Sequence, residues 1–232
     1  MSVVNVLSGG AAAAVVKGVL AQFEQETGAR VNGTFSAVGQ MRDQLVAGTP
    51  CDLVILTSPL VAKLIASGHV VAGSAKSLGL VKTGVAVPAG AARPKIGNRE
   101  EVGAAFRAAS EIYYPDPEKA TAGIHFMNVL KALGLDQELK AAFRPYPNGA
   151  TAMGEMAKSR ARNVIGCTQE TEINYTPGVD LVGSLPQEFE LATDYTLGIC
   201  TNAQQPELAR KLAAMVAGPA SEAIRRQGGF EF

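Results

Sequence analysis

The chain has 232 residues, of which 47% are hydrophobic and 18% are charged, an ordinary globular balance with ample material for a buried core. Lys plus Arg and Asp plus Glu both number 21, so the formal net charge is zero. This balance argues against an electrostatic nucleic-acid binder, because such proteins carry a basic excess or a basic stripe.

Strand-like and helix-like segments alternate from the start of the chain. The run 51–57 is apolar throughout, as is typical of a central strand that is covered on both faces. The expected strands are 3–7, 29–35 and 51–57. The expected helices are 11–27, which ends at Gly28, and 58–68. Between them, a further helix is expected to follow residues 36–41. This alternation predicts a parallel sheet with helices on both faces.

The alternation is looser in the rest of the chain. Residues 77–90 are interpreted as one long strand or two in succession, placed to run from one lobe into the next. The further expected strands are 111–117, 163–170, 179–186 and 189–201, with 143–149 a strand or a loop. The further expected helices are 100–109, 121–134, 150–160, 206–218 and 221–230.

The cysteines are few and widely spaced. An odd set of Cys51, Cys167 and Cys200 argues against a disulfide framework or a metal knuckle, and favours small buried hydrophobes in a reducing compartment. The first residues lack the parts of a secretory signal. The protein is therefore expected in the cytoplasm if Met1 is the natural start, and in the periplasm if a signal segment has been removed.

Four expected strand-to-helix junctions carry small or polar residues. The first N–H groups of a helix have no partner inside the helix, and the helix dipole makes that end positive, so each junction could hold an anion. Ordinary capping by Ser and Thr is the alternative for each junction taken singly. The repetition of the pattern favours an anion site. The candidate ligand-binding residues at these junctions are Ser8, Gly9, Gly10, Ser36, Gly39, Gln40, Thr57, Ser58, Thr121, Ala122 and Gly123.

The order of these segments resembles the molybdate-binding-protein group of ABC-importer receptors over nearly the whole chain. The resemblance is carried by SGGAAAAV, TPCDLVILT, YPDPEKATAGIHF, IGCTQETEI and ELARKLAAMVAGPASEAIRRQGGF. It implies an α/β, type II periplasmic-binding-protein fold, in which each of two lobes has a mainly parallel sheet flanked by helices and the ligand cleft lies between them. It further implies a first lobe of 1–80 and 195–232, a second lobe of 84–192, and hinge crossovers near 81–83 and 193–195.

Two positions depart from the molybdate-binding pattern. That family places serine donors after its first and second strands, where this chain has Ala11 and Val38. The Ser-Gly-Gly opening followed by alanines is more similar to a side branch that includes aconitate isomerase. That resemblance implies a cofactor-free proton shift along an allylic tricarboxylate, which needs oxyanion donors and an acid/base group.

The acid/base candidates are His125 and Glu170. His125 lies about one turn inside its expected helix, and it either faces the ligand or lies on the surface. Glu170 follows an expected strand and is a possible base if burial raises its pKa. Glu172 is interpreted as a solvated loop acid, and Cys167 as a buried packing residue without an activating neighbour. His69 is expected on the surface, away from the site.

Further residues are candidates for ligand binding. Arg42 could clamp a carboxylate, although a solvated helix face is the slightly favoured alternative. Gln169 could donate to a carboxylate from the end of its strand. Asn148 and Thr151 begin a helix and could offer backbone N–H groups. Tyr195 lies near the expected hinge, where its hydroxyl could reach the ligand or merely pack.

The sequence contains no Walker loop, dinucleotide-binding fingerprint, HExxH motif or nucleophile elbow, so no cofactor or metal is expected. We expect a protein that binds a small di- or tricarboxylate and catalyses an allylic proton shift. The alternative is the substrate-binding protein of an ABC importer for molybdate or another oxyanion or carboxylate, with the permease as its partner. No nucleic acid and no membrane insertion are expected under either hypothesis.

Overall fold

The computed structural model describes residues 2–232, and the chain forms two compact units. Unit 1 comprises Met1–Leu80 and Thr193–Phe232, and unit 2 comprises Val81–Ala192. The chain passes between the units within two strands, β4 (Lys76–Pro88) and β9 (Ala192–Ile199). The ligand cleft between lobes stays a prediction.

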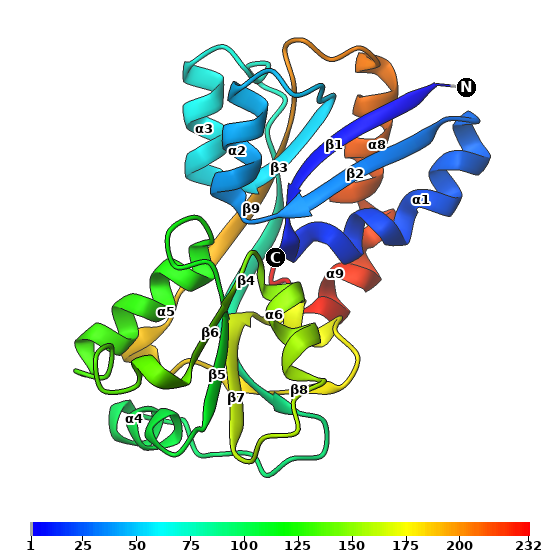
Figure 1. Cartoon of the computed structure of the whole chain (residues 1–232). Coiled ribbons are helices and arrows are strands. Elements are labelled where there is room, and N and C mark those ends of the chain that lie inside the picture. Colours follow the sequence, from blue (N-terminus) through cyan, green and yellow to red (C-terminus); the bar gives the residue numbers. More distant parts are fainter. Residues whose placement is uncertain (1) are drawn as a thin grey trace. The chain divides into compact units, whose positions relative to one another are not determined.

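Unit 1 is built around a sheet in the order β2-β1-β3-β9. Strand β1 (Val3–Gly9) runs parallel to β2 (Arg30–Ser36) and β3 (Leu53–Thr57), whereas β9 is antiparallel to β3. The helical segments are η1 (Gly10–Ala12), α1 (Ala13–Thr27), α2 (Val38–Val46), α3 (Ser58–Ala66), α8 (Pro206–Ala217), η4 (Pro219–Ser221) and α9 (Glu222–Gly228). Helix α1 packs against α8 and α9, so the C-terminal helices complete the core that the N-terminal segments begin (Figure 1).

Unit 2 has its own sheet in the order β4-β7-β5-β6, with β8 paired to β4. Its further strands are β5 (Glu111–Pro115), β6 (Phe143–Tyr146), β7 (Val164–Gln169) and β8 (Val179–Ser184). Its helical segments are α4 (Arg99–Arg107), α5 (Thr121–Ala132), η2 (Lys140–Ala142), α6 (Gly149–Met156), α7 (Glu170–Asn174) and η3 (Gln187–Phe189). Strands β6, β5 and β7 are parallel, whereas β7 and β8 are antiparallel to β4.

Two separate clusters of apolar side chains fill unit 2. The first joins α4 and α5 to the sheet through tilted aromatic rings, with the Phe106 and Phe126 centroids 5.0 Å apart. The second joins α6 to the sheet through Met153 and Met156. Helices therefore cover both faces of this sheet, as the alternating pattern predicts (Figure 1).

The structure decides between several sequence-based expectations. Of the two alternatives for residues 77–90 it has one strand, and each sheet is mainly parallel, as predicted, with β9 antiparallel in unit 1 and β4 antiparallel in unit 2. The cause is that β4 and β9 enter from the other unit and run against their neighbours. Residue Glu170 begins the short helix α7 instead of ending a strand, and Phe189 lies in η3 instead of in β9.

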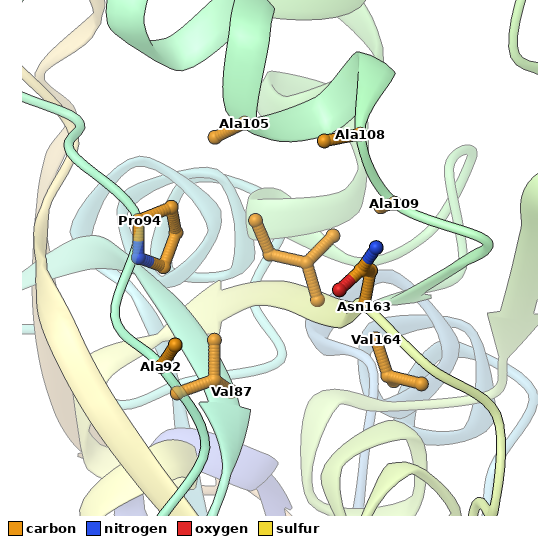
Figure 2. A pocket seen from close by; sticks show the side chains of 9 residues that line it. Val87, Ala92, Pro94, Ala105, Ala108, Ala109, Asn163 and Val164 are labelled. Atoms are coloured by element: carbon orange, nitrogen blue, oxygen red, sulfur yellow. The ribbon is translucent and has the colours of Figure 1, made fainter.

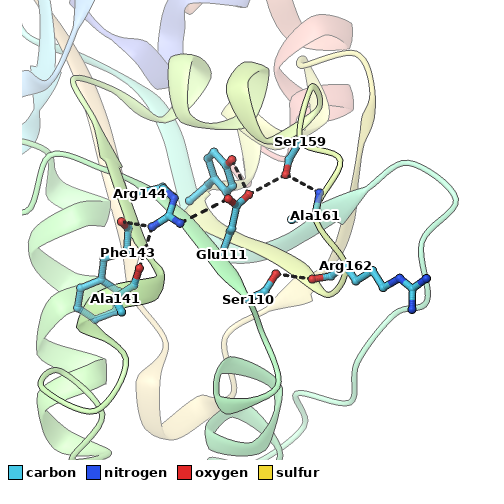
Figure 3. Close-up of polar contacts among 9 residues, drawn as sticks. Ser110, Glu111, Ala141, Phe143, Arg144, Ser159, Ala161 and Arg162 are labelled. Atoms are coloured by element: carbon cyan, nitrogen blue, oxygen red, sulfur yellow. Dashed lines mark hydrogen bonds and ion pairs between the residues drawn. The ribbon is translucent and has the colours of Figure 1, made fainter.

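A polar network holds the amino end of β5. The Glu111 carboxylate accepts hydrogen bonds from Ser159 Oγ at 2.7 Å and from the Tyr113 hydroxyl at 2.9 Å, and it pairs with Arg144 Nη2 at 3.4 Å (Figure 3). These contacts, led by that of Ser159, lower the pKa of Glu111 below its usual value. The network ties β5, β6 and the loop after α6 together at the edge opposite to the strands' carboxyl ends. Its position and partners assign it a structural role.

Candidate functional site

Three parallel strands of unit 1 end side by side. Gly9 at the end of β1 is paired with Ser36 at the end of β2, and Ser8 is paired with Ile55 of β3. Each strand leads directly or through one residue into a helical segment, η1, α2 or α3. Ligands of parallel α/β sheets lie beyond the carboxyl ends of the strands. The three helical N-termini therefore gather first-turn N–H groups at this edge of unit 1.

Side-chain caps are present at two helix N-termini of unit 2. Asn98 caps α4 by accepting from Glu101 N at 3.0 Å, and Asn148 caps α6 by accepting from Thr151 N at 2.8 Å. By contrast, the N-cap residue makes no side-chain cap hydrogen bond at η1, α2, α3 and α5, the helical segments that follow the predicted anion-binding junctions. The same holds for α1, α7, α8 and α9, so the lack of a cap is not confined to those junctions. First-turn N–H groups of such helices can bind water or an anion.

The hydroxyl groups at this edge of unit 1 are engaged inside the protein. Ser8 Oγ donates to the carbonyl of Gly9 at 2.9 Å, and Ser36 Oγ donates to Gln40 Oε1 at 2.7 Å. Thr57 is buried and Ser58 is half-buried at the start of α3. Because the hydroxyls of Ser8 and Ser36 are committed inside the protein, backbone N–H groups are the candidate donors at these two junctions.

Gly9 is required by close packing at this edge. A Cβ atom at Gly9 would lie 2.7 Å from Cγ1 of Val38 and 3.1 Å from Cε1 of Tyr195. Tyr195 is buried, is paired with Thr57 across the β3–β9 ladder, and meets the Phe230 ring edge-on. The structure thus brings Tyr195 next to the predicted junction residues. Its aromatic ring packs there, which was one of the two predicted roles.

Gly39 and Gln40 lie in the first turn of α2, and Arg42 lies just after that turn. Its guanidinium donates through Nε to Asp43 Oδ1 at 2.9 Å, and its side chain is 44% exposed. The ion pair with a neighbouring residue fits the solvated helix face that the sequence slightly favours. Arg42 stays a candidate ligand because an exposed ion pair of this kind is weak.

In unit 2, α5 begins close against the end of β5. A Cβ atom at Gly123 would lie 2.2 Å from the carbonyl oxygen of Asp116 and 2.3 Å from that of Pro115, so only glycine fits. Thr121 is half-buried and Ala122 is buried in the same uncapped turn. These three predicted residues are therefore together at the carboxyl end of β5.

His125 joins α5 to η3. Its Nε2 lies 2.8 Å from the carbonyl oxygen of Phe189, and because a carbonyl can only accept, Nε2 carries the proton and donates. The half-buried imidazole thus has one nitrogen committed to the fold of unit 2. This contact supports a positioning role, whereas the predicted proton transfer would have to use Nδ1.

The N-terminus of α6 is filled by the protein itself. Besides the Asn148 cap, the carboxylate of Glu172 accepts from Thr168 Oγ1 at 2.6 Å and from the backbone N–H groups of Gly149 and Ala150. The expectation of a solvated Glu172 is wrong, since the residue is buried and burial raises its pKa. Asn148 and Thr151, predicted as ligand donors, are engaged in capping. Sequence spacing does not reveal this arrangement because β7 and α7 bring the carboxylate to α6.

Gln169 and Glu170 are both buried where β7 passes into α7. The Glu170 carboxylate accepts from Ser184 Oγ at 2.6 Å. Gln169 is paired with Thr83 across the β4–β7 ladder. The structure therefore places the predicted carboxylate and the predicted amide donor next to each other, out of bulk water.

Two threonines that the sequence analysis missed lie beside this pair. Thr83 and Thr171 are 1% and 2% exposed, and their hydroxyl groups have no hydrogen-bond partner among the described residues. A buried hydroxyl without a partner is costly, which points to an occupant such as a ligand or ordered water. Thr83 falls at the expected hinge crossover of 81–83, but threonine is common in strands and no signal in the sequence marks its hydroxyl as a ligand donor.

Two further residues do not serve acid/base chemistry at this site. Cys167 is fully buried and burial raises its pKa, which confirms the packing role predicted for it. His69 lies in unit 1, is half-buried and contacts Ser67 Oγ through Nδ1 at 2.9 Å. It is thus less exposed than predicted.

A small apolar cavity of about 120 Å³ lies elsewhere in unit 2. Ala105, Ala108, Pro94, Val87 and Asn163 are among the residues around it (Figure 2). Asn163 and Val164 stand at the amino end of β7, at the edge opposite to Gln169. The cavity is therefore not part of the candidate site.

Residues 2–232 contain no cluster of three or more His, Cys, Asp or Glu side chains that could hold a metal ion. None of their helices combines the length and the apolar character needed to cross a membrane.

Comparisons with known proteins agree with this geometry. A sequence model of the family described as bacterial extracellular solute-binding protein matches residues 4–231. A curated aconitate isomerase from Pseudomonas sp is 28% identical over 237 residues, which cover 98% of this chain and 87% of that protein. The periplasmic molybdate-binding protein of Azotobacter vinelandii has a TM-score of 0.80 at 20% identity, with 99% of both chains covered.

A further similar structure is the sulfate-binding protein SubI of Mycobacterium tuberculosis. It has a TM-score of 0.75 at 15% identity, with 99% of this chain and 86% of that chain covered. At such identities the likeness shows the fold, which is the two-lobed α/β fold of periplasmic binding proteins. The type II periplasmic-binding fold expected from the sequence is thereby confirmed.

Proposed function

We propose, from the premise that this chain belongs to the bacterial extracellular solute-binding protein family, that it binds a small di- or tricarboxylate. The observation that carries the proposal is the pair of buried hydroxyl groups of Thr83 and Thr171, which have no hydrogen-bond partner among the described residues. In addition, the N-cap residues of the helical segments after β1, β2, β3 and β5 make no side-chain cap hydrogen bond. Uncapped N-termini stabilise an anion without a buried counter-charge.

A carboxylate fits these donors better than molybdate does. Two hydroxyl groups that could grip a tetrahedral oxyanion, those of Ser8 and Ser36, already donate within the protein. Ala11 and Val38 are buried and apolar where molybdate receptors have serines. The curated relative is named for an isomerase of aconitate, a tricarboxylate, and it supports the same ligand class.

We further propose that the protein shifts a proton along an unsaturated carboxylate, with Glu170 as the acid/base group. The carboxylate would accept a proton from a methylene carbon and return one to the far carbon of the double bond. One C–H bond breaks, another forms and the double bond moves, so no redox partner is needed. The burial of Glu170 and its Ser184 hydrogen bond support this role, because they fix the carboxylate away from bulk water.

The second candidate function is the substrate-binding protein of an ABC importer. It is supported by the family and by the molybdate- and sulfate-binding proteins of similar fold. Its partner would be a membrane permease. The two functions share a bound anion and differ in whether the bound anion is changed.

A ligand screen tests the proposal first. Citrate, cis-aconitate, trans-aconitate, molybdate, tungstate and sulfate are each added to the protein, and thermal unfolding is measured. A carboxylate at a hundred times its Kd should stabilise the protein by about 2.7 kcal/mol. Stabilisation by molybdate or tungstate alone would contradict the carboxylate proposal and favour the importer.

Incubation with aconitate in D₂O, followed by NMR, separates catalysis from binding. Deuterium incorporation or interconversion of the two isomers is the expected result. Binding without exchange would identify a carboxylate receptor.

Glu170→Gln tests the acid/base assignment. We expect the variant to keep ligand-dependent stabilisation and to lose turnover by a factor of about 10²–10⁴, because the amide cannot accept the proton. His125→Ala is the matched control, since it removes the hydrogen bond to Phe189 and should lower the free energy of unfolding by about 1 kcal/mol. A loss of turnover in His125→Ala with full activity in Glu170→Gln would transfer the acid/base role to His125.

A further inference from the structure

A second cavity, in unit 1, holds two cysteines. It measures about 320 Å³, and Thr49, Cys51, His69 and Cys200 are among the residues around it. Cys51 precedes β3 and Cys200 follows β9, so the cavity lies at the opposite end of β3 from Thr57. It is therefore separate from the candidate anion site of the same unit.

The two thiol groups are close together. Cys51 Sγ donates to the carbonyl oxygen of Leu53 at 3.2 Å, and it is near enough to Cys200 to raise the pKa of that thiol. The backbone brings the residues together, since Cys200 N donates to the carbonyl of Asp52, the neighbour of Cys51, at 3.0 Å. A disulfide requires closely spaced Cα atoms, and the backbone hydrogen bond beside Cys51 and the shared cavity bring the two residues near each other.

The cysteines differ in access. Cys51 is 7% exposed and Cys200 is 2% exposed, and both line the cavity. The nearby Cys51 side chain and burial raise the pKa of Cys200, which keeps it as a thiol. Cys167 belongs to the core of unit 2 and has no cysteine partner there. The pair in unit 1 is thus distinguished from the third cysteine by its cavity and by the closeness of its two thiols.

We propose that Cys51 and Cys200 are a peroxide-sensitive dithiol that closes to an intramolecular disulfide. The Cys51 sulfur attacks one oxygen of hydrogen peroxide, and the O–O bond breaks. Cys51 becomes a sulfenic acid, and the other oxygen leaves as water. The Cys200 sulfur then attacks the Cys51 sulfur, the S–O bond breaks, and a second water carries away the Cys200 proton. Hydrogen peroxide is reduced to two waters and the two thiols are oxidised to one disulfide.

The bond would connect the residues before β3 to the end of β9. A disulfide stabilises a protein mainly by restricting its unfolded chain, and the effect grows with the length of the closed loop. The segment from Cys51 to Cys200 contains all of unit 2, so the loop is long. Oxidation is therefore expected to raise the unfolding temperature of the protein.

Mass spectrometry of the full chain tests the proposal. The protein is treated with hydrogen peroxide, denatured, alkylated with iodoacetamide and weighed. We expect one alkylated cysteine in place of three, a linked peptide containing Cys51 and Cys200, and reversal by dithiothreitol. Cys167→Ser is the matched control and should still form the link, whereas Cys51→Ser and Cys200→Ser should not.

Several outcomes would overturn the proposal. They are oxygen addition to Cys51 without a link, a link through Cys167 or between two chains, and three cysteines that remain alkylatable after peroxide treatment. Circular dichroism of Cys51→Ser and Cys200→Ser shows whether each variant is folded. The readout involves no ligand, so its result does not depend on the proposed carboxylate function.

Discussion

Replacing Glu172 with alanine is expected to lower the free energy of unfolding by about 3–5 kcal/mol. The carboxylate accepts from the Thr168 hydroxyl and from the N–H groups of Gly149 and Ala150 at the start of α6. All of these donors would lose their acceptor in a buried place. Urea unfolding of the variant and the parent protein at pH 7 measures the difference.

Glu172→Gln is the matched control. Its amide oxygen can still accept from backbone N–H groups, and its amide nitrogen can donate to Thr168, so a smaller loss is expected. A loss in Glu172→Ala of the size seen for a surface residue, within about 0.5 kcal/mol, would contradict the capping role.

The pH dependence of stability provides a second test of the same carboxyl group. Burial raises the pKa of Glu172, so the folded protein keeps this proton to a higher pH than the unfolded chain does. The stability that the proton contributes is complete below the unfolded pKa of about 4.3 and is lost as pH rises through the folded pKa. Glu172→Gln should remove this contribution to the change of the free energy of unfolding with pH.

Replacing Thr83 or Thr171 with valine is expected to weaken carboxylate binding by about ten- to a hundredfold, the effect of losing one hydrogen bond to a charged group. Valine keeps the shape of threonine and removes only the hydroxyl. Because neither hydroxyl has a partner among the residues described, its removal should leave the stability of the ligand-free protein unchanged or raise it. Calorimetric titration with the ligand and urea unfolding without it measure the two effects.

Thr168→Val provides the opposite pattern and serves as the control. Its hydroxyl donates to Glu172, so its loss should lower stability and leave the ligand's own contacts intact. If Thr83→Val and Thr171→Val lower stability as Thr168→Val does and leave the affinity unchanged, these hydroxyls have a structural role and not a binding one.

The capping contrast also separates the candidate residues by role. At α6 the positive end of the helix is occupied by the protein's own carboxylate, and no ligand is needed there. At α2, α3 and α5 the side chain of the N-cap residue makes no cap hydrogen bond. The same local sequence feature, a small or polar residue before a helix, therefore has two outcomes that depend on what the fold brings to it.

Local sequence patterns determined the elements and the family of this protein. The alternation of apolar runs and helical spacing predicts the strands and helices because side-chain periodicity and glycine are local properties. The junctions at Ser8, Ser36, Thr57 and Thr121 are short-range features as well, and the structure has uncapped helices after each of them.

Only the tertiary structure decided which polar groups meet. Glu172 reaches α6, His125 reaches Phe189, and Cys51 lies close to Cys200 through pairings between segments far apart in the chain. The directions of β4 and β9, and with them the mixed sheets, follow from the passage of the chain between the units. Whether a polar side chain is solvated, capped or left for a ligand depends on burial and on distant partners, and neither is encoded in its sequence neighbours.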